Sequence, residues 1–230
     1  MTIFDGLERL AFLRGDPAAW LVVATAVAIV LIPDVRLALL ALAGQYFAAA
    51  LLFVDVLDPR LAIVLPLVGW FVCLILTITG QQVNWGRPPE DLTAAEVALW
   101  RQPRFVRLGR YRLPRLAVTT ALVVVTLLLV LWLAGRPNFY LPLVPDTLAH
   151  LNLAVYGLLA FGLLQMALAS APLAAGLGLF TFLTGFALFY SNLDQSLGVL
   201  ALLAAVNLGL ALAVSYLAQA RRSQLSMVNG

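Results

Sequence analysis

The stretch that decides the fold is LAVYGLLAFGLLQMALASAPLAAGLGLFTFLTGFALFYSNL, residues 153–193, which contains no Asp, Glu, Lys, Arg or His. The segment Ser170-Ala171-Pro172 divides it into two apolar runs. Each run is about 20 residues long, the length that an α-helix needs to cross the hydrocarbon core of a bilayer. A turn this short requires antiparallel neighbours. The stretch therefore predicts two transmembrane helices packed side by side.

The composition of the whole chain agrees with this local pattern. Of its 230 residues, 63% are hydrophobic and 11% are charged, whereas a soluble domain is about one-quarter charged. We therefore expect an all-α integral membrane protein, a polytopic helical bundle. The single cysteine, Cys73, lies inside a predicted span and excludes an intramolecular disulfide. No metal-binding, phosphate-binding or catalytic motif of soluble enzymes is present in the sequence, so we expect no catalytic residue, no metal and no nucleic-acid partner.

Apolar runs predict about seven spans, divided three plus four by one long loop. The spans are 18–32, 37–54, 61–79, 116–133, 148–169, 172–190 and 197–217. The first is short for a bilayer. The expected organisation is an interfacial segment with three helices (1–80), a loop (81–115), four helices (116–220) and a tail (221–230).

The long loop is rich in arginine. Its first part, RPPEDLTAAEVALW, predicts a short surface helix. Its second part forms a basic patch of six residues: Arg101, Arg104, Arg107, Arg110, Arg112 and Arg115. Such a patch is typical of the cytoplasmic side of a membrane protein. It would also suit anionic lipids or a partner protein, and these interpretations are compatible.

The distribution of arginine predicts the orientation. With seven spans, ten of the fourteen basic residues fall on the side of the long loop: Arg36, Arg87, Arg101, Arg104, Arg107, Arg110, Arg112, Arg115, Arg221 and Arg222. The positive-inside rule makes that side cytoplasmic. We expect a multi-pass protein of the cell (inner) membrane, with an extracytoplasmic N-terminus and a cytoplasmic C-terminus.

Few polar side chains lie within the predicted spans, and none near a span centre is Asp, Glu, Lys or Arg. Five are candidates for an intramembrane polar seam: Gln45, Gln165, Asn207, Thr181 and Thr184. One interpretation is interhelical hydrogen bonding, worth roughly 1 kcal/mol for each bond, with the threonines bonding to carbonyls one turn earlier. The other is a hydrated path through the bundle.

His150 stands at the mouth of the fifth predicted span. A histidine there could ligate a haem or chlorin, or relay protons. The alternative is an interfacial histidine with a hydrogen-bonding partner. Because His150 is the only histidine and a b-type haem normally uses two, we expect no cofactor, although a bound lipid or quinone stays open.

From about residue 150 onward, the sequence resembles the 4L (K-type) membrane subunit of respiratory complex I. It is more similar still to the E component of the hydrogenase-4 relatives of that complex. The segments that carry the resemblance are 153–193 and VLALLAAVNLGLALAVSYLAQARRS, residues 199–223. Gly178 and Gly185 match small positions of the family, and GLAL (209–212) with the basic tail matches its third helix.

The resemblance implies an antiporter-like assembly, yet the charged positions of the family are not retained. The two intramembrane glutamates of the family fall on Phe180 (Leu183 in the E-component register) and on Ala205. A lysine expected in the N-terminal region falls near Val64 or Leu65. Since Phe and Ala cannot accept a proton, direct proton transfer by this chain is not expected.

Three functions remain open on the sequence alone. The first is a non-catalytic scaffold subunit of a larger energy-transducing complex of the complex I, hydrogenase-4 or cation–proton antiporter type, with other membrane subunits and anionic lipids as partners. The second is a small stand-alone transporter or channel with a polar seam. The third is an accessory subunit of a photosynthetic or respiratory complex that contacts quinone, pigment or lipid.

Overall fold

The computed structural model describes residues 14–57, 62–86, 105–108, 111–141 and 148–228. Long helices dominate these residues, which confirms the expected all-α fold. The helices are α2 (Asp16–Leu31), α3 (Val35–Val56), α5 (Val64–Gln82), α7 (Arg115–Ala134), α8 (His150–Leu168), α9 (Pro172–Ser191) and α10 (Leu197–Val228). Two short 3₁₀ turns, η2 (Asn84–Gly86) and η3 (Pro137–Phe139), and two strands, β1 (Phe105–Leu108) and β2 (Tyr111–Pro114), complete the list.

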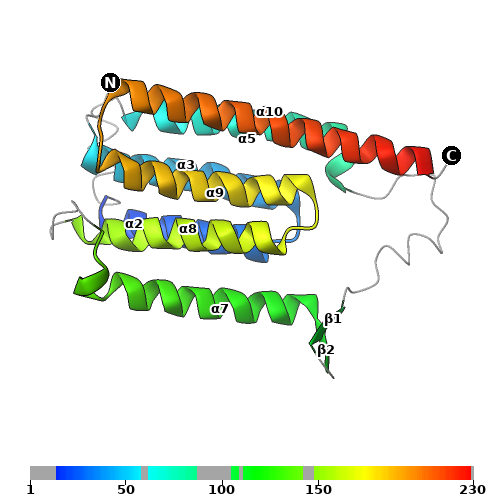
Figure 1. Ribbon diagram of the computed structural model, residues 1–230, viewed down its shortest axis with the longest axis horizontal. Coiled ribbons are helices and arrows are strands. Elements are labelled where there is room, and N and C mark those ends of the chain that lie inside the picture. The colour runs from blue at the N-terminus through cyan, green and yellow to red at the C-terminus, as the bar shows by residue number, and fades with distance from the viewer. Residues whose placement is uncertain (1–13, 58–61, 87–104, 109–110, 142–147, 229–230) are drawn as a thin grey trace.

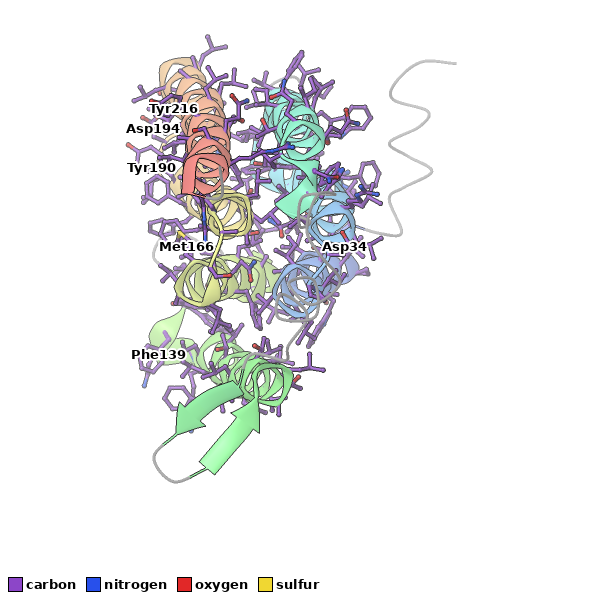
Figure 2. All side chains as sticks on the ribbon, turned by 90° about the vertical axis from the view of Figure 1, so that its right-hand side faces the viewer. Asp34, Phe139, Met166, Tyr190, Asp194 and Tyr216 are labelled. Atoms are coloured by element: carbon purple, nitrogen blue, oxygen red, sulfur yellow. The ribbon has the colours of Figure 1, made fainter. Side chains whose placement is uncertain are left out.

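The helices form two layers (Figures 1 and 2). One layer contains α2, α3 and α5, and the other contains α8, α9 and α10. Across the layers, α2 faces α8, α3 faces α9, and α5 faces α10. Helix α7 lies at one edge, against α8 and α2. The helices before and after the long loop therefore pack face to face.

Six helices of the described part are long and apolar enough to cross a membrane: α3, α5, α7, α8, α9 and α10. The chain is thus a multi-pass membrane protein. Helix α2 has 16 residues, about 24 Å at 1.5 Å per residue, which is short against a hydrocarbon core of about 30 Å. It nevertheless packs along α3 and α8. The seventh crossing stays a prediction.

Local sequence explains several helix boundaries. Pro17 and Pro172 stand in the first turns of α2 and α9, where the missing N–H of proline removes no helical hydrogen bond. Asp34 caps α3, because its side chain accepts a hydrogen bond of 2.9 Å from the Arg36 backbone N–H. Asp194 accepts one of 2.8 Å from the Ser196 N–H just before α10.

The long loop differs from its prediction. Strands β1 and β2 form an antiparallel hairpin in which Arg107 pairs with Arg112 in register, a feature that was not predicted from the sequence. The short alternation of apolar and basic residues favours such a strand pair. The arginines of this segment were interpreted only as a basic patch. The predicted surface helix at 87–100 lies outside the described residues.

Helix α10 is longer than the span predicted for it. It runs on to Val228, beyond the predicted end of the span at 217, because no Gly or Pro interrupts residues 210–228.

Glycines bring α8 and α9 together. A Cβ on Gly178 would lie 2.8 Å from the Gly162 carbonyl oxygen and 2.8 Å from the Met166 nitrogen. A Cβ on Gly162 would lie 2.6 Å from the Phe182 nitrogen. Small residues let helix backbones approach closely within a membrane. The small-residue positions in the opening stretch are therefore used inside the chain.

Candidate functional site

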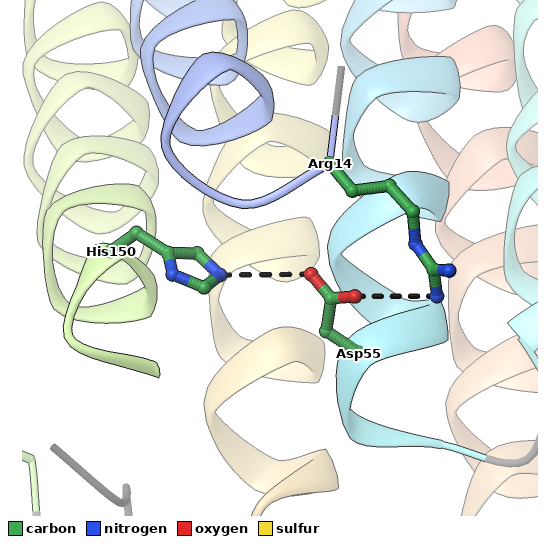
Figure 3. A network of polar contacts seen from close by, with 3 residues as sticks. All are labelled: Arg14, Asp55 and His150. Atoms are coloured by element: carbon green, nitrogen blue, oxygen red, sulfur yellow. Dashed lines mark ion pairs between the residues drawn. The ribbon is translucent and has the colours of Figure 1, made fainter. Parts of the chain in front are cut away.

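One polar cluster joins three segments at one end of the bundle (Figure 3). Arg14 Nη2 lies 3.3 Å from Asp55 Oδ1, and His150 Nε2 lies 3.6 Å from Asp55 Oδ2. Arg14 precedes α2, Asp55 is in the last turn of α3, and His150 is the first residue of α8. We call these three residues the rim cluster and this end of the bundle the Asp55 end.

The rim cluster is partly buried. The exposed fractions of the side chains are 35% for Arg14, 17% for Asp55 and 10% for His150. Arg14 Nε and His150 Nε2 are buried without a hydrogen-bond partner. The carboxylate of Asp55 thus lies between a guanidinium and an imidazole, and it connects α3 to α8 and to the start of α2.

His150 lies at the end of the bundle, next to Asp55. Its imidazole is directed at a carboxylate near the end of the bundle and is only slightly exposed. Among the described residues, no group of three or more His, Cys, Asp or Glu side chains could hold a metal ion. No sequence pattern connects Arg14 with Asp55, because only the fold brings residue 14 next to residue 55.

In the middle of the bundle, Gln45 of α3 meets Thr181 of α9. The Thr181 hydroxyl donates to Leu177 O at 3.0 Å and lies 3.4 Å from Gln45 Oε1. Gln45 is fully buried, and its Nε2 has no hydrogen-bond partner. The expected back-bonding of the threonines is confirmed, since Thr184 donates to Phe180 O at 2.7 Å.

A second polar group surrounds a cavity of about 10 Å³ between α3, α5, α9 and α10. Its polar lining residues are Tyr46, Thr184 and Asn207. Asn207 Nδ2 donates to Leu203 O of its own helix at 2.9 Å. Thr184 and Asn207 are candidate seam residues of the sequence, and the fold adds Tyr46, the neighbour of Gln45, to them.

Gln165 does not join either group. Its Nε2 lies 3.3 Å from Ala174 O, across the turn from α8 to α9. Ala174 lies seven residues before Thr181 on α9, about 10 Å along the helix axis. The five candidate seam residues thus divide into the Gln45–Thr181 pair, the cavity residues Thr184 and Asn207, and a separate Gln165.

One buried interhelical hydrogen bond was missed altogether. Thr79 of α5 and Ser215 of α10 form a buried hydroxyl–hydroxyl bond of 2.8 Å. Nothing in the local pattern of either helix distinguishes these two residues from other Ser and Thr residues near a span end.

The arginines of the C-terminal helix bind backbone carbonyls at the other end of the bundle. The guanidinium of Arg222 donates to Gln82 O at the end of α5, and that of Arg221 donates to Ser170 O after α8. Gln219 Nε2 donates to Gln82 Oε1 at 2.6 Å. Cations stabilise helix C-termini, where carbonyls lack partners within the helix. We call this the Arg222 end.

The positions where the resemblance implies carboxylates do not share a region. Phe180 is fully buried in the core, and Ala205 is exposed on α10. Leu183, the alternative position, is half-buried and lines the cavity. Of the basic patch, Arg107 and Arg112 lie in the strands and Arg115 begins α7, while Arg101, Arg104 and Arg110 lie outside the described residues.

Chemically, the described interior offers hydroxyl and amide groups but no Asp, Glu, Lys or Arg in the middle of a helix. Charged groups lie at the two ends, in the rim cluster and at the Arg222 end. Comparisons with protein-family models, curated proteins and solved structures gave no match. The fold and composition make this chain a multi-pass helical membrane protein.

Proposed function

We propose that this chain is a non-catalytic integral membrane subunit that packs, through the outer face of α10, against other membrane chains of a larger assembly. The observation that carries the proposal is a row of small residues at four-residue spacing: Ala201, Ala205, Gly209 and Ala213. All four are exposed. We call this row the α10 small-residue face.

The opposite face of α10 packs within the chain, against α5 and α9. It includes the buried residues Ala211, Val214 and Ala218. The small-residue face points away from the bundle, and a Cβ on Gly209 would meet nothing within 4 Å. Larger exposed side chains flank the face, among them Leu202, Leu212 and Tyr216. A row of small residues between larger ones forms a shallow groove.

Small residues at four-residue spacing favour close contact between transmembrane helices, because dispersion and backbone approach replace the hydrophobic effect in lipid. Inside this chain, Gly162 and Gly178 already have this role between α8 and α9. The same device on an outward face favours a second helix over lipid chains as its neighbour.

The type of assembly rests on the sequence resemblance of residues 153–223 alone. That resemblance supports an energy-transducing complex of the complex I, hydrogenase-4 or cation–proton antiporter type. A supporting role without proton transfer fits the buried Phe180 and the exposed Ala205 at the two positions of the family carboxylates.

The test is copurification of the tagged full-length chain from its native membranes in mild detergent. We expect the wild-type chain to retain stoichiometric larger membrane proteins, identified by mass spectrometry. Gly209→Leu should release them, since the leucine fills the groove, while leaving the chain folded, since nothing inside the chain lies near that position.

The control is Ala121→Leu on the exposed face of α7, which places the same leucine side chain on another apolar surface and should retain the partners. A wild-type chain that purifies alone, or only with copies of itself, would contradict the proposal. So would partners that withstand Gly209→Leu.

A further inference from the structure

The cavity between α3, α5, α9 and α10 has room for at most one water molecule. Its volume is about 10 Å³, at the lower limit of what a single water requires, about 10–15 Å³. Most of its wall is apolar, and Tyr46, Thr184 and Asn207 provide the polar part. A water persists in such a place only if two to four polar groups bind it.

The Tyr46 hydroxyl is a buried donor that lies near the Thr184 side chain but forms no hydrogen bond of normal geometry. Its side chain is buried, with 7% exposed, and its hydroxyl has no hydrogen-bond partner. The ring packs on Gly69 of α5, where a Cβ would lie 2.3 Å from a ring carbon, so the ring is held in place. A buried hydroxyl without a partner destabilises the fold, and the bilayer core offers no bulk water to relieve it.

Thr184 and Asn207 supply acceptors. The hydrogen of the Thr184 hydroxyl is directed at Phe180 O, which leaves lone pairs on its oxygen. The amino group of Asn207 donates to Leu203 O, so its side-chain carbonyl is the acceptor available to the cavity. One donor and two acceptors complement a water molecule, which accepts and donates two bonds each.

We propose that the cavity binds one structural water that joins α3, α9 and α10. The Tyr46 hydroxyl donates to this water, which in turn donates to Thr184 Oγ1 and Asn207 Oδ1. The direct side-chain bond from α10 to α5, between Thr79 and Ser215, lies farther toward the Arg222 end. The water site belongs to the single chain, so it stands whether or not α10 has a partner outside.

The experiment is X-ray hydroxyl-radical footprinting of the full chain in lipid nanodiscs, read by mass spectrometry. Radicals formed on a bound water label the side chains beside it, so Tyr46 should be labelled in the wild type. Phe161 is fully buried and does not line the cavity, so it should stay unlabelled. Asn207→Leu removes one acceptor at similar volume and should lower the Tyr46 label to the level of Phe161.

Gln165→Leu is the matched control, because it removes a buried amide that lies outside the cavity, and it should leave the label unchanged. If Asn207→Leu does not fold, Thr184→Val removes the other acceptor and should lower the label in the same way. A wild-type Tyr46 without label would overturn the proposal, as would a label that persists when either acceptor is removed.

Discussion

Phe180 is the residue at which this chain departs most clearly from the family that it resembles. It stands where the family pattern places a carboxylate, and it is one of the largest fully buried side chains of the described residues. It belongs to the same core cluster as Leu42 and Leu76. The side chain therefore fills space between helices, and its removal leaves a cavity instead of freeing a site.

We expect Phe180→Ala to lower the free energy of unfolding by about 3–5 kcal/mol, the usual cost of deleting a buried phenylalanine. Phe186→Ala, on an exposed position of the same helix, should cost much less. Both are measured by SDS titration in mixed micelles, followed by circular dichroism. Equal losses for the two variants would contradict a packing role specific to Phe180.

The rim cluster is the second residue-scale feature, and its strength is limited by solvent. Because Arg14 is about one-third exposed, we expect a coupling of roughly 1 kcal/mol or less between Arg14→Gln and Asp55→Asn, as for other accessible ion pairs. A double-mutant cycle of unfolding free energies measures it.

Asp16→Asn is the control for that cycle, because Asp16 is an exposed acid close to Arg14 in sequence. Its combination with Arg14→Gln should be additive. A coupling as large for Asp16 as for Asp55 would mean that general charge, and not the contact in Figure 3, governs the result.

Residue type and position predicted that Gln45, Thr181 and Thr184 lie inside the bundle, but not which groups they contact. Gln45 and Thr181 were both named as candidate seam residues. They lie 136 residues apart in the sequence, and only the fold brings them into contact. Tyr46 stands next to Gln45 in the sequence, but neither its type nor its position predicts that it borders a cavity. Only the placement of Gly69 against its ring reveals why its hydroxyl remains inside.

At the scale of elements, glycines explain which helices touch. Small residues recur along both 172–190 and 197–217. The structure separates the two cases, since Gly178 packs on α8 and Gly209 faces open space. Sequence could not separate them, because both lie in apolar helices of similar composition.

We expect Gly178→Ala to destabilise the isolated chain by about 1–3 kcal/mol, because the added methyl overlaps backbone atoms of α8 and forces the helices apart. Gly209→Ala should be neutral or stabilising, since it meets no atom and alanine favours the helix by about 1 kcal/mol. Thermal unfolding in the same detergent measures both. A stable Gly178→Ala variant would contradict the close approach of α8 and α9.

At the scale of the whole molecule, tight turns predicted antiparallel neighbours along the chain, and these are present. The pairing of the two layers could not be predicted, because apolar helices carry no local label for the helix they face. The contacts of α3 with α9 and of α5 with α10 include the Gln45–Thr181 and Thr79–Ser215 side-chain pairs. The hairpin before α7 was not predicted either, because each of its strands has only four residues and gives a weak sequence pattern.

The orientation of the chain in the membrane depends on whether α2 crosses it, because that crossing determines on which side each arginine-containing loop lies. Arg14 pairs with Asp55 at the end of α3, and three residues separate the end of α2 at Leu31 from the start of α3 at Val35. Helix α2 therefore runs from the Asp55 end toward the other end of the bundle beside its longer neighbours. With α2 counted as a crossing, the arginine distribution predicts that the Asp55 end is extracytoplasmic and the Arg222 end cytoplasmic.

Single-cysteine labelling tests this orientation with little change to the protein, because Cys73 is the only native thiol and is buried. On a Cys73→Ala background, Asn138→Cys and Ala171→Cys place exposed thiols before and after α8, at opposite ends of the bundle. A membrane-impermeant maleimide added to intact cells should label position 138 and not 171, and permeabilisation should expose both. The reverse pattern would overturn the orientation inferred from arginine, and labelling of both in intact cells would mean that α8 does not cross. Because α8 lies between the two thiols, the result depends on the direction of one helix and not on the count of all seven.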